Sequence, residues 1–243
     1  MRSLIFNMDD LSFKPISDGK LPILADQTSA GTSVVQLHHA ITEDDCVNIS
    51  PYPMLCSAAQ TLHFRDVISG LGSNSVIIEL YAGLGGNVLS VENQIPEGAE
   101  YHLIEPLWIR PTSMALGGWS GYGALKWMEQ IDLNHHISGY VDLQRYALDR
   151  LQPIPAVRIW PYEPSVLTFW KGDIDLLVCN LPFTTHDPFD DASRYFDMLR
   201  PGGKAVGFNY HIYPSGQRLA HRLSAAKRSR IDMSEGFWSI PKT

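Results

Sequence analysis

The chain has 243 residues, of which 44% are apolar, and it carries a formal net charge of −7. This length favours one α/β domain with an N-terminal extension over two complete domains. The negative charge argues against a protein that coats nucleic acid without sequence preference, because such binding depends on Lys and Arg side chains at the phosphates.

The sequence contains no targeting or membrane signal. No apolar run reaches the roughly 18 residues that a membrane-spanning helix needs. The first residues, MRSLIFNMDDLSF, lack the basic-then-apolar order of a signal peptide. The three cysteines have no C-x-x-C spacing, and the histidine pairs are adjacent and so cannot share a helix face as metal ligands. We therefore expect an intracellular, cytoplasmic protein with reduced thiols, no membrane partner and no metal site.

Residues 1–52 are predicted to form an extension or arm, and residues 53–243 the domain. A helix is expected in the segment MLCSAAQTLHFRDVISGLG, which has apolar residues at helical spacing and Gly70 near its end. The residues that this spacing turns toward the core are Leu55, Ala59, Leu62 and Val67. The helix leads into the first core strand, residues 75–80.

Apolar strands alternate with helical segments through the rest of the domain. The further predicted strands are residues 100–106, 156–160, 173–180 and 204–210, and a helix over residues 188–199 ends at RPGG. Residues 106–155 are more than one crossover needs, which predicts either an insertion over the ligand site or an ordinary helical layer. The alternation indicates a doubly wound, mostly parallel α/β sheet whose ligand lies at the carboxyl ends of the strands.

The stretch VIIELYAGLGGN, residues 76–87, reads as a buried strand that ends in a tight glycine turn with a helix behind it. Gly83 and Gly85 are followed by Val88, where a dinucleotide-binding motif would have its third glycine. No Lys-Ser or Lys-Thr follows, so the phosphate-binding P-loop is also excluded. The turn therefore favours a nucleoside ligand without a pyrophosphate over NAD or ATP.

Two other strand ends carry candidate ligand residues. Glu105 ends the strand after the glycine turn, where its carboxylate could accept hydrogen bonds from both ribose hydroxyls, although an acid before a proline turn can also be a plain surface residue. The tetrapeptide NLPF, residues 180–183, follows the fourth strand. Its alternative interpretation is a strand exit whose proline ends the strand and whose phenylalanine packs in the core. In an open α/β sheet these ends converge on one crevice.

From about residue 75 to residue 213 the chain resembles the class I S-adenosylmethionine-dependent methyltransferases, which have a Rossmann-like fold. The acid with its glycine turn, the ribose acid, the fourth-strand motif and LRPGGKAVGF occur in the order of that family. NLPF is similar to the Asn-x-Pro-aromatic motif of enzymes that methylate nitrogens of nucleobases or the amide of glutamine. The match resembles ribosomal-RNA adenine dimethyltransferases and guanine-N2 methyltransferases, the latter usually with a second proline where Leu181 stands.

This resemblance implies S-adenosylmethionine as the cofactor and assigns residues to it. Glu79 would orient the methionine end, the glycines would admit the cofactor, Glu105 would hold the ribose, and Glu163, or Tyr162 beside it, would flank the adenine. The complete predicted set of cofactor-binding residues is Glu79, Tyr81, Gly83, Gly85, Gly86, Asn87, Glu105 and Glu163.

The predicted catalytic residues are those of NLPF. A base amine is a poor nucleophile, so the carbonyl oxygens of the Asn180 side chain and the Leu181 backbone would accept its hydrogens. Pro182 would fix the turn, and Phe183 could stack on the base. His186 could act as a base or contact substrate, but a loop histidine with a solvent or carboxylate partner is an equal alternative.

The segment QRLAHRLSAAKRSR, residues 217–230, predicts a helix with Leu219 and Leu223 on an apolar stripe and Arg218 and Arg222 on a basic face. This face is the candidate substrate contact for nucleic acid, or simply a solvated surface. The favoured acceptor is a nucleobase nitrogen in RNA or DNA, with RNA preferred. The alternatives are a small-molecule N- or O-methyltransferase and a non-catalytic module that binds a protein partner through its N-terminal extension.

Overall fold

The computed structural model describes residues 47–49, 52–54, 58–83, 85–106, 148–170, 172–180, 187–208 and 215–243. The predictions for most of the N-terminal extension and for most of the 106–155 insertion lie outside these residues. So do the predicted roles of Leu55, Leu181, Pro182, Phe183 and His186.

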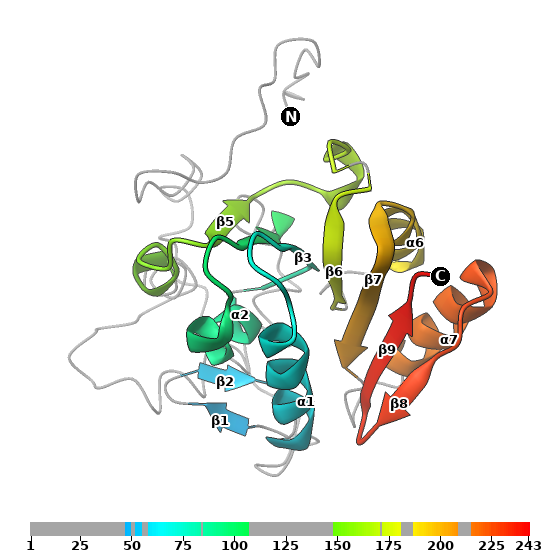
Figure 1. Cartoon of the computed structure of the whole chain (residues 1–243), viewed down its shortest axis with the longest axis horizontal. Helices are drawn as coiled ribbons and strands as arrows, with labels where there is room; N and C mark the ends of the chain where they lie inside the picture. Colours follow the sequence, from blue (N-terminus) through cyan, green and yellow to red (C-terminus); the bar gives the residue numbers. More distant parts are fainter. Residues whose placement is uncertain are drawn as a thin grey trace, which may run out of the picture.

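The described part of the chain forms a seven-stranded sheet in the order β5-β4-β3-β6-β7-β9-β8 (Figure 1). The neighbours from β5 to β7 pair in parallel, whereas β9 is antiparallel to β7 and β8 is antiparallel to β9. The strands are β3 Val76–Leu80, β4 Glu100–Ile104, β5 Val157–Trp160, β6 Ile174–Cys179, β7 Leu199–Phe208, β8 Asp232–Ser234 and β9 Phe237–Pro241. The predicted doubly wound, mostly parallel sheet is thus confirmed.

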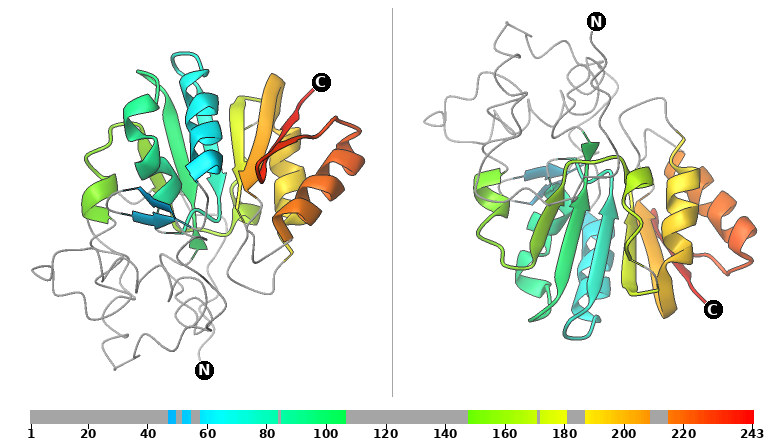
Figure 2. Two further views of the ribbon diagram at one scale, coloured as in Figure 1. Left: turned by 90° about the horizontal axis from the view of Figure 1, so that it is seen from below. Right: turned by 90° about the horizontal axis from the view of Figure 1, so that it is seen from above.

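Helices cover both faces of the sheet (Figure 2). Within the described residues the named helices are α1 Ala58–Ser69, α2 Gly86–Ser90, α6 Phe189–Asp197 and α7 Ser215–Lys227, with short 3₁₀ turns at η4 Glu92–Gln94 and η7 Pro164–Val166. Side chains of α1, α2 and the helical residues 148–151 share one hydrophobic cluster with the sheet. Side chains of α6, α7 and the segment after η7 share the other. A small hairpin, β1 Val47–Ile49 with β2 Tyr52–Met54, lies beside α2 (Figure 1).

The central strands are buried because both faces are covered. All six residues of β6, IDLLVC, are buried, which is the near-continuous apolar pattern expected of a parallel strand between two helical layers. At the far edge, all three residues of β8 are exposed. No described helix is long and apolar enough to cross a membrane.

The predicted phase of α1 is wrong at one position. Leu62, expected to face the core, is 58% exposed, whereas Phe64 and Ile68 are fully buried. Phe64 packs edge-on against Phe208 of β7 at 5.5 Å between ring centroids, so it lies on the stripe of the helix that faces inward. Val67 is partly buried against the same cluster, as expected.

The sequence prediction lacked the two C-terminal strands. They form a hairpin through Glu235 and Gly236, whose φ angles of 49° and 80° are those of a two-residue turn with both central residues left-handed. β9 then packs on β7 at a glycine. A Cβ on Gly207 would lie 2.3 Å from the Trp238 ring and 2.8 Å from the Cys179 carbonyl, so only glycine fits there.

Candidate functional site

The sheet has a switch point between β3 and β6. From β3 the chain moves outward to β4 and β5, and from β6 it moves the opposite way to β7. In open α/β sheets, ligands bind outside the carboxyl ends of the strands at such a point. Glu79 lies within the last residues of β3, and Glu105 and Asn180 directly follow β4 and β6. The fold therefore brings these three predicted residues to one end of the sheet.

Glu79 is fully buried, with hydrogen bonds on both carboxylate oxygens. Oε1 accepts from the side-chain amides of Asn87 and Asn180, each at 2.7 Å, and Oε2 accepts from the Tyr101 hydroxyl at 2.8 Å. The Asn87 amide also donates to Asn180 Oδ1 at 3.2 Å. Burial raises the pKa of the Glu79 carboxyl from 4.5 to about 7, although the three donors act to lower it. We call these four residues the Glu79 network.

The Glu79 network joins three elements around the predicted site. Asn87 is in the first turn of α2, Tyr101 is on β4, and Asn180 follows β6. Because both carboxylate oxygens already have donors from within the protein, contact between Glu79 and the methionine end of a cofactor would require the network to rearrange. That role stays a prediction.

The glycine turn has a left-handed backbone at three described positions. The φ angles are 54° at Tyr81, 56° at Gly83 and 78° at Gly85. A Cβ on Gly85 would lie 2.9 Å from both terminal methyls of Leu151, so this glycine serves packing as well as the turn. Gly86 begins α2, a helix of five residues.

Glu105 fastens the glycine turn to the end of β4. Its side chain is 1% exposed, and its Oε2 accepts the Gly83 backbone N–H at 2.8 Å. This contact places Glu105 beside the glycine turn, as the predicted convergence of the strand ends requires. Binding of ribose hydroxyls by the same carboxylate is not tested by it and stays a prediction.

Tyr81 connects the turn to α6, a link that the sequence did not predict. Its hydroxyl donates to Asp191 Oδ2, and Asp191 forms an ion pair with Arg194. The pKa of the Tyr81 hydroxyl is raised well above its ordinary value, first by burial, then by the hydrogen bond and charge of Asp191, and then by the charges of Glu163 and Glu105. Glu163 is exposed at the start of η7, yet it is near enough to act on this phenol.

Two partners, Tyr101 and Asp191, carried no usable signal in the sequence. In the sequence, Tyr101 is indistinguishable from the other aromatic and apolar residues of a buried strand. The structure shows that its ring is buried and that its hydroxyl donates to Glu79. Asp191 stands in the first turn of α6, where acids are common because they favour the helix dipole. Only the packing of α6 against the turn singles it out.

Several cations of α7 and of the residues just after it form ion pairs with acids. Arg222 forms an ion pair with Asp187 at 2.7 Å and lies 4.3 Å over the Phe189 ring. Lys227 and Arg230 pair with other acids, Asp197 and Asp232. The predicted apolar stripe of Leu219 and Leu223 is buried, as expected, and Arg218 is exposed.

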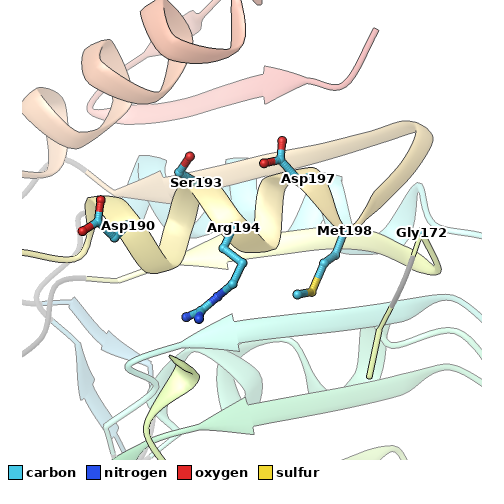
Figure 3. Close-up of a pocket in the computed structure, with 6 residues that line it drawn as sticks. All are labelled: Gly172, Asp190, Ser193, Arg194, Asp197 and Met198. Carbon is cyan, nitrogen blue, oxygen red and sulfur yellow. The ribbon is translucent and has the colours of Figure 1, made fainter. Parts of the chain in front are cut away.

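A surface hollow of about 560 Å³ lies along α6, outside the predicted site. Figure 3 shows its lining residues, which are Gly172, Asp190, Ser193, Arg194, Asp197 and Met198. None of them belongs to the predicted cofactor-binding or catalytic set. The described residues also contain no group of three or more His, Cys, Asp or Glu that could hold a metal ion.

No protein-family model and no curated protein matches the chain. Among solved structures, a SAM-dependent O-methyltransferase from Thermotoga maritima matches at 11% identity and a TM-score of 0.48. The match covers 77% of this chain and 66% of that enzyme. Geranyl diphosphate C-methyltransferase from Streptomyces coelicolor, in complex with S-adenosyl-L-homocysteine, matches at 12% identity and a TM-score of 0.48. This match covers 77% of our chain and 76% of that enzyme.

Haemonchus contortus phospholethanolamine N-methyltransferase 2, in complex with S-adenosylhomocysteine, matches at 13% identity and a TM-score of 0.40. The match covers 63% of this chain and 29% of that enzyme, so the chain spans less than a third of its length. At such low identities and TM-scores, the chemistry has to be argued from the residues of the site.

Proposed function

We propose that the protein is an S-adenosylmethionine-dependent methyltransferase. The observation that carries this proposal is the meeting of the glycine turn with Asn180 at the switch point of the sheet. Asn87, in the first turn of α2 directly after the glycine turn, and Asn180 after β6 both donate to one carboxylate oxygen of Glu79. The segment that would admit the cofactor and the residue that would hold the acceptor are thus in direct contact.

The turn suits a cationic nucleoside ligand. Gly83 and Gly85 have no side chains to obstruct a close approach, and Glu105 lies against the Gly83 backbone. Glu105 and Glu163 both act electrostatically on Tyr81, so negative charge surrounds the turn. A bound S-adenosylmethionine would supply the methyl group, and its positively charged sulfonium fits this electrostatic environment.

A nucleobase nitrogen is the acceptor that the site residues favour. Asn180 is 7% exposed, and its amide N–H faces Glu79. Its amide oxygen accepts from Asn87 at 3.2 Å, and its second lone pair can accept a hydrogen from an N–H group of the acceptor. Holding the nitrogen in line with the methyl donor would supply much of the rate enhancement. RNA remains our preferred source of the base.

A small-molecule acceptor is the second candidate, and one observation favours it. Of the two predicted contacts, Arg222 is paired with an acid, whereas Arg218 is exposed, and the nearby Lys227 and Arg230 are also paired with acids. These ion pairs reduce the positive charge available to a nucleic acid backbone.

The first test is calorimetric titration with S-adenosylmethionine and, separately, NAD. Micromolar binding of S-adenosylmethionine alone is expected, and Glu105→Ala should weaken it at least about tenfold because the Gly83 contact is lost. Glu97→Ala, an exposed acid ahead of β4, is the control and should bind as the wild type does. Absence of S-adenosylmethionine binding by the wild type would contradict the proposal and favour the non-catalytic module.

The second test follows a tritiated methyl group from S-adenosylmethionine into total RNA, single-stranded DNA or a small-metabolite fraction. Label in RNA that is lost with rising salt supports the nucleobase proposal. Label confined to metabolites, independent of salt, would replace it with the small-molecule alternative.

A further inference from the structure

Asn180 has a side-chain amide that the rest of the fold holds in one of its two possible orientations. Its Nδ2 donates to Glu79 Oε1 at 2.7 Å, and its Oδ1 accepts from Asn87 Nδ2 at 3.2 Å. Flipping the amide by 180° would place Oδ1 against the carboxylate oxygen and Nδ2 against another N–H group. Both contacts would then be repulsive, so the carboxylate selects the orientation.

We propose that Glu79 is a positioning residue for Asn180 and not a cofactor ligand. This inference rests on the proposed function, because it concerns how the acceptor side of that site is organised. Glu79 is fully buried, whereas Asn180 is 7% exposed and directly follows β6. The carboxylate therefore acts on a substrate through the amide, and the amide oxygen is the atom that it presents.

Tyr101 completes the arrangement from the neighbouring strand. Its hydroxyl donates to Glu79 Oε2 at 2.8 Å and is itself fully buried, so the carboxylate is fixed at both oxygens. The ionised carboxylate is the stronger acceptor for these three donors, because a proton on one oxygen removes the negative charge and one of the four lone-pair sites. Protonation of Glu79 thus weakens the hydrogen bond that holds the Asn180 amide.

The groups around Glu79 explain why this protonation occurs near neutral pH. The partners from α2, β4 and the end of β6 are Asn87, Tyr101 and Asn180, and none of them is a cation. The three hydrogen bonds offset burial only in part, so the pKa of the Glu79 carboxyl is raised to about 7. Tyr101 stays protonated, because burial and the charge of Glu79 raise its pKa.

The test is a pH titration of the side-chain amide signals in ¹⁵N-labelled full-length protein. The Asn87 and Asn180 signals are identified by their loss in Asn87→Asp and Asn180→Asp, and the exposed Asn74 amide serves as an internal control. We expect both network amides to shift together with a midpoint near pH 7 in the wild type. In Glu79→Gln, whose amide oxygen can still accept both bonds, the shifts should disappear. Asn180 amide signals that are the same in the wild type and in Glu79→Gln at every pH would overturn the proposal.

A second measurement separates a positioning residue from a cofactor ligand. Glu79→Gln should bind S-adenosylmethionine within about threefold of the wild type, because the variant keeps the two amide contacts. A loss of more than about tenfold would make Glu79 a cofactor ligand and overturn the inference. If the wild type binds no S-adenosylmethionine, the proposed function fails on its own, while the amide titration still decides whether Glu79 orients Asn180.

Discussion

The carboxyl end of the central strands and the outer face of α7 use charge in opposite ways. At the strand ends the carboxylate of Glu79 is fully enclosed and is held by neutral donors. On α7, Arg222 and its partner Asp187 are about half exposed and opposite in charge. The enclosed group cannot be screened by salt or replaced by water, so changes there should be costly, whereas changes on α7 should be mild.

The largest expected effect is at Gly207, where neighbouring groups leave no room for a Cβ. Gly207→Ala should lower the free energy of unfolding by about 3 kcal/mol or more, because the new methyl would overlap the Trp238 ring and the Cys179 carbonyl. Urea unfolding measures this loss. Gly72→Ala is the matched control, since a Cβ there has no atom within 4 Å, and its unfolding curve should be nearly unchanged.

The next effect is the pH dependence of stability that Glu79 causes. Between pH 4.5 and about 7 the folded state keeps a proton on Glu79 that the unfolded state has lost. The free energy of unfolding should therefore fall as pH rises through this window, by up to about 3 kcal/mol from this group.

Comparison with Glu79→Gln isolates this contribution, because the variant lacks the titrating group. The comparison is needed because burial lowers the pKa of His102 to about 4, which gives a slope of opposite sign over part of the same range. Parallel stability curves of the wild type and Glu79→Gln from pH 5 to 8 would contradict the prediction.

A smaller effect is expected at the link between the turn and α6. Tyr81→Phe should cost about 1 kcal/mol of stability, because Asp191 loses the hydroxyl and keeps Arg194. A double-mutant cycle with Asp191→Asn measures the coupling between the two side chains by urea unfolding. Additive losses would mean that the hydroxyl and the carboxylate do not act together.

The smallest effect is expected on α7. Arg222→Ala should cost about 0.5 kcal/mol, because both members of its ion pair are exposed. Arg218→Ala, one turn earlier on the same helix, is the control for helix propensity. The difference between the two should shrink at about 0.5 M salt. If Arg222→Ala lowers the free energy of unfolding by more than Tyr81→Phe does, the proposed difference between the two regions is wrong.

Much of the fold could be predicted because apolar strands and glycine turns are local signals. The strand ends with Glu79, Glu105 and Asn180 fall together by the geometry of any doubly wound sheet. The C-terminal hairpin had a signal too, since Glu235 and Gly236 separate two short runs as a two-residue turn would. Its short strands concealed it.

The details of the site could not be predicted in this way. The direction of the Glu79 side chain depends on which groups surround it after folding, and Tyr101 reaches it from a neighbouring strand. Which side of α1 faces the core also depends on contacts with distant residues. Phe64 packs on Phe208, and Leu62 is exposed. Contacts between elements that are distant in sequence decide such choices, and a single pattern along the chain does not contain them.

The exposed edge strand β8 has a consequence for behaviour at high concentration. An unpaired strand edge can template pairing with a second molecule, and long apolar edges are the ones that aggregate. β8 has only three residues, and Asp232 within it is paired with Arg230. An edge this short and charged offers few backbone groups to which a strand of a second molecule could hydrogen-bond. We expect this side of the sheet to resist self-association.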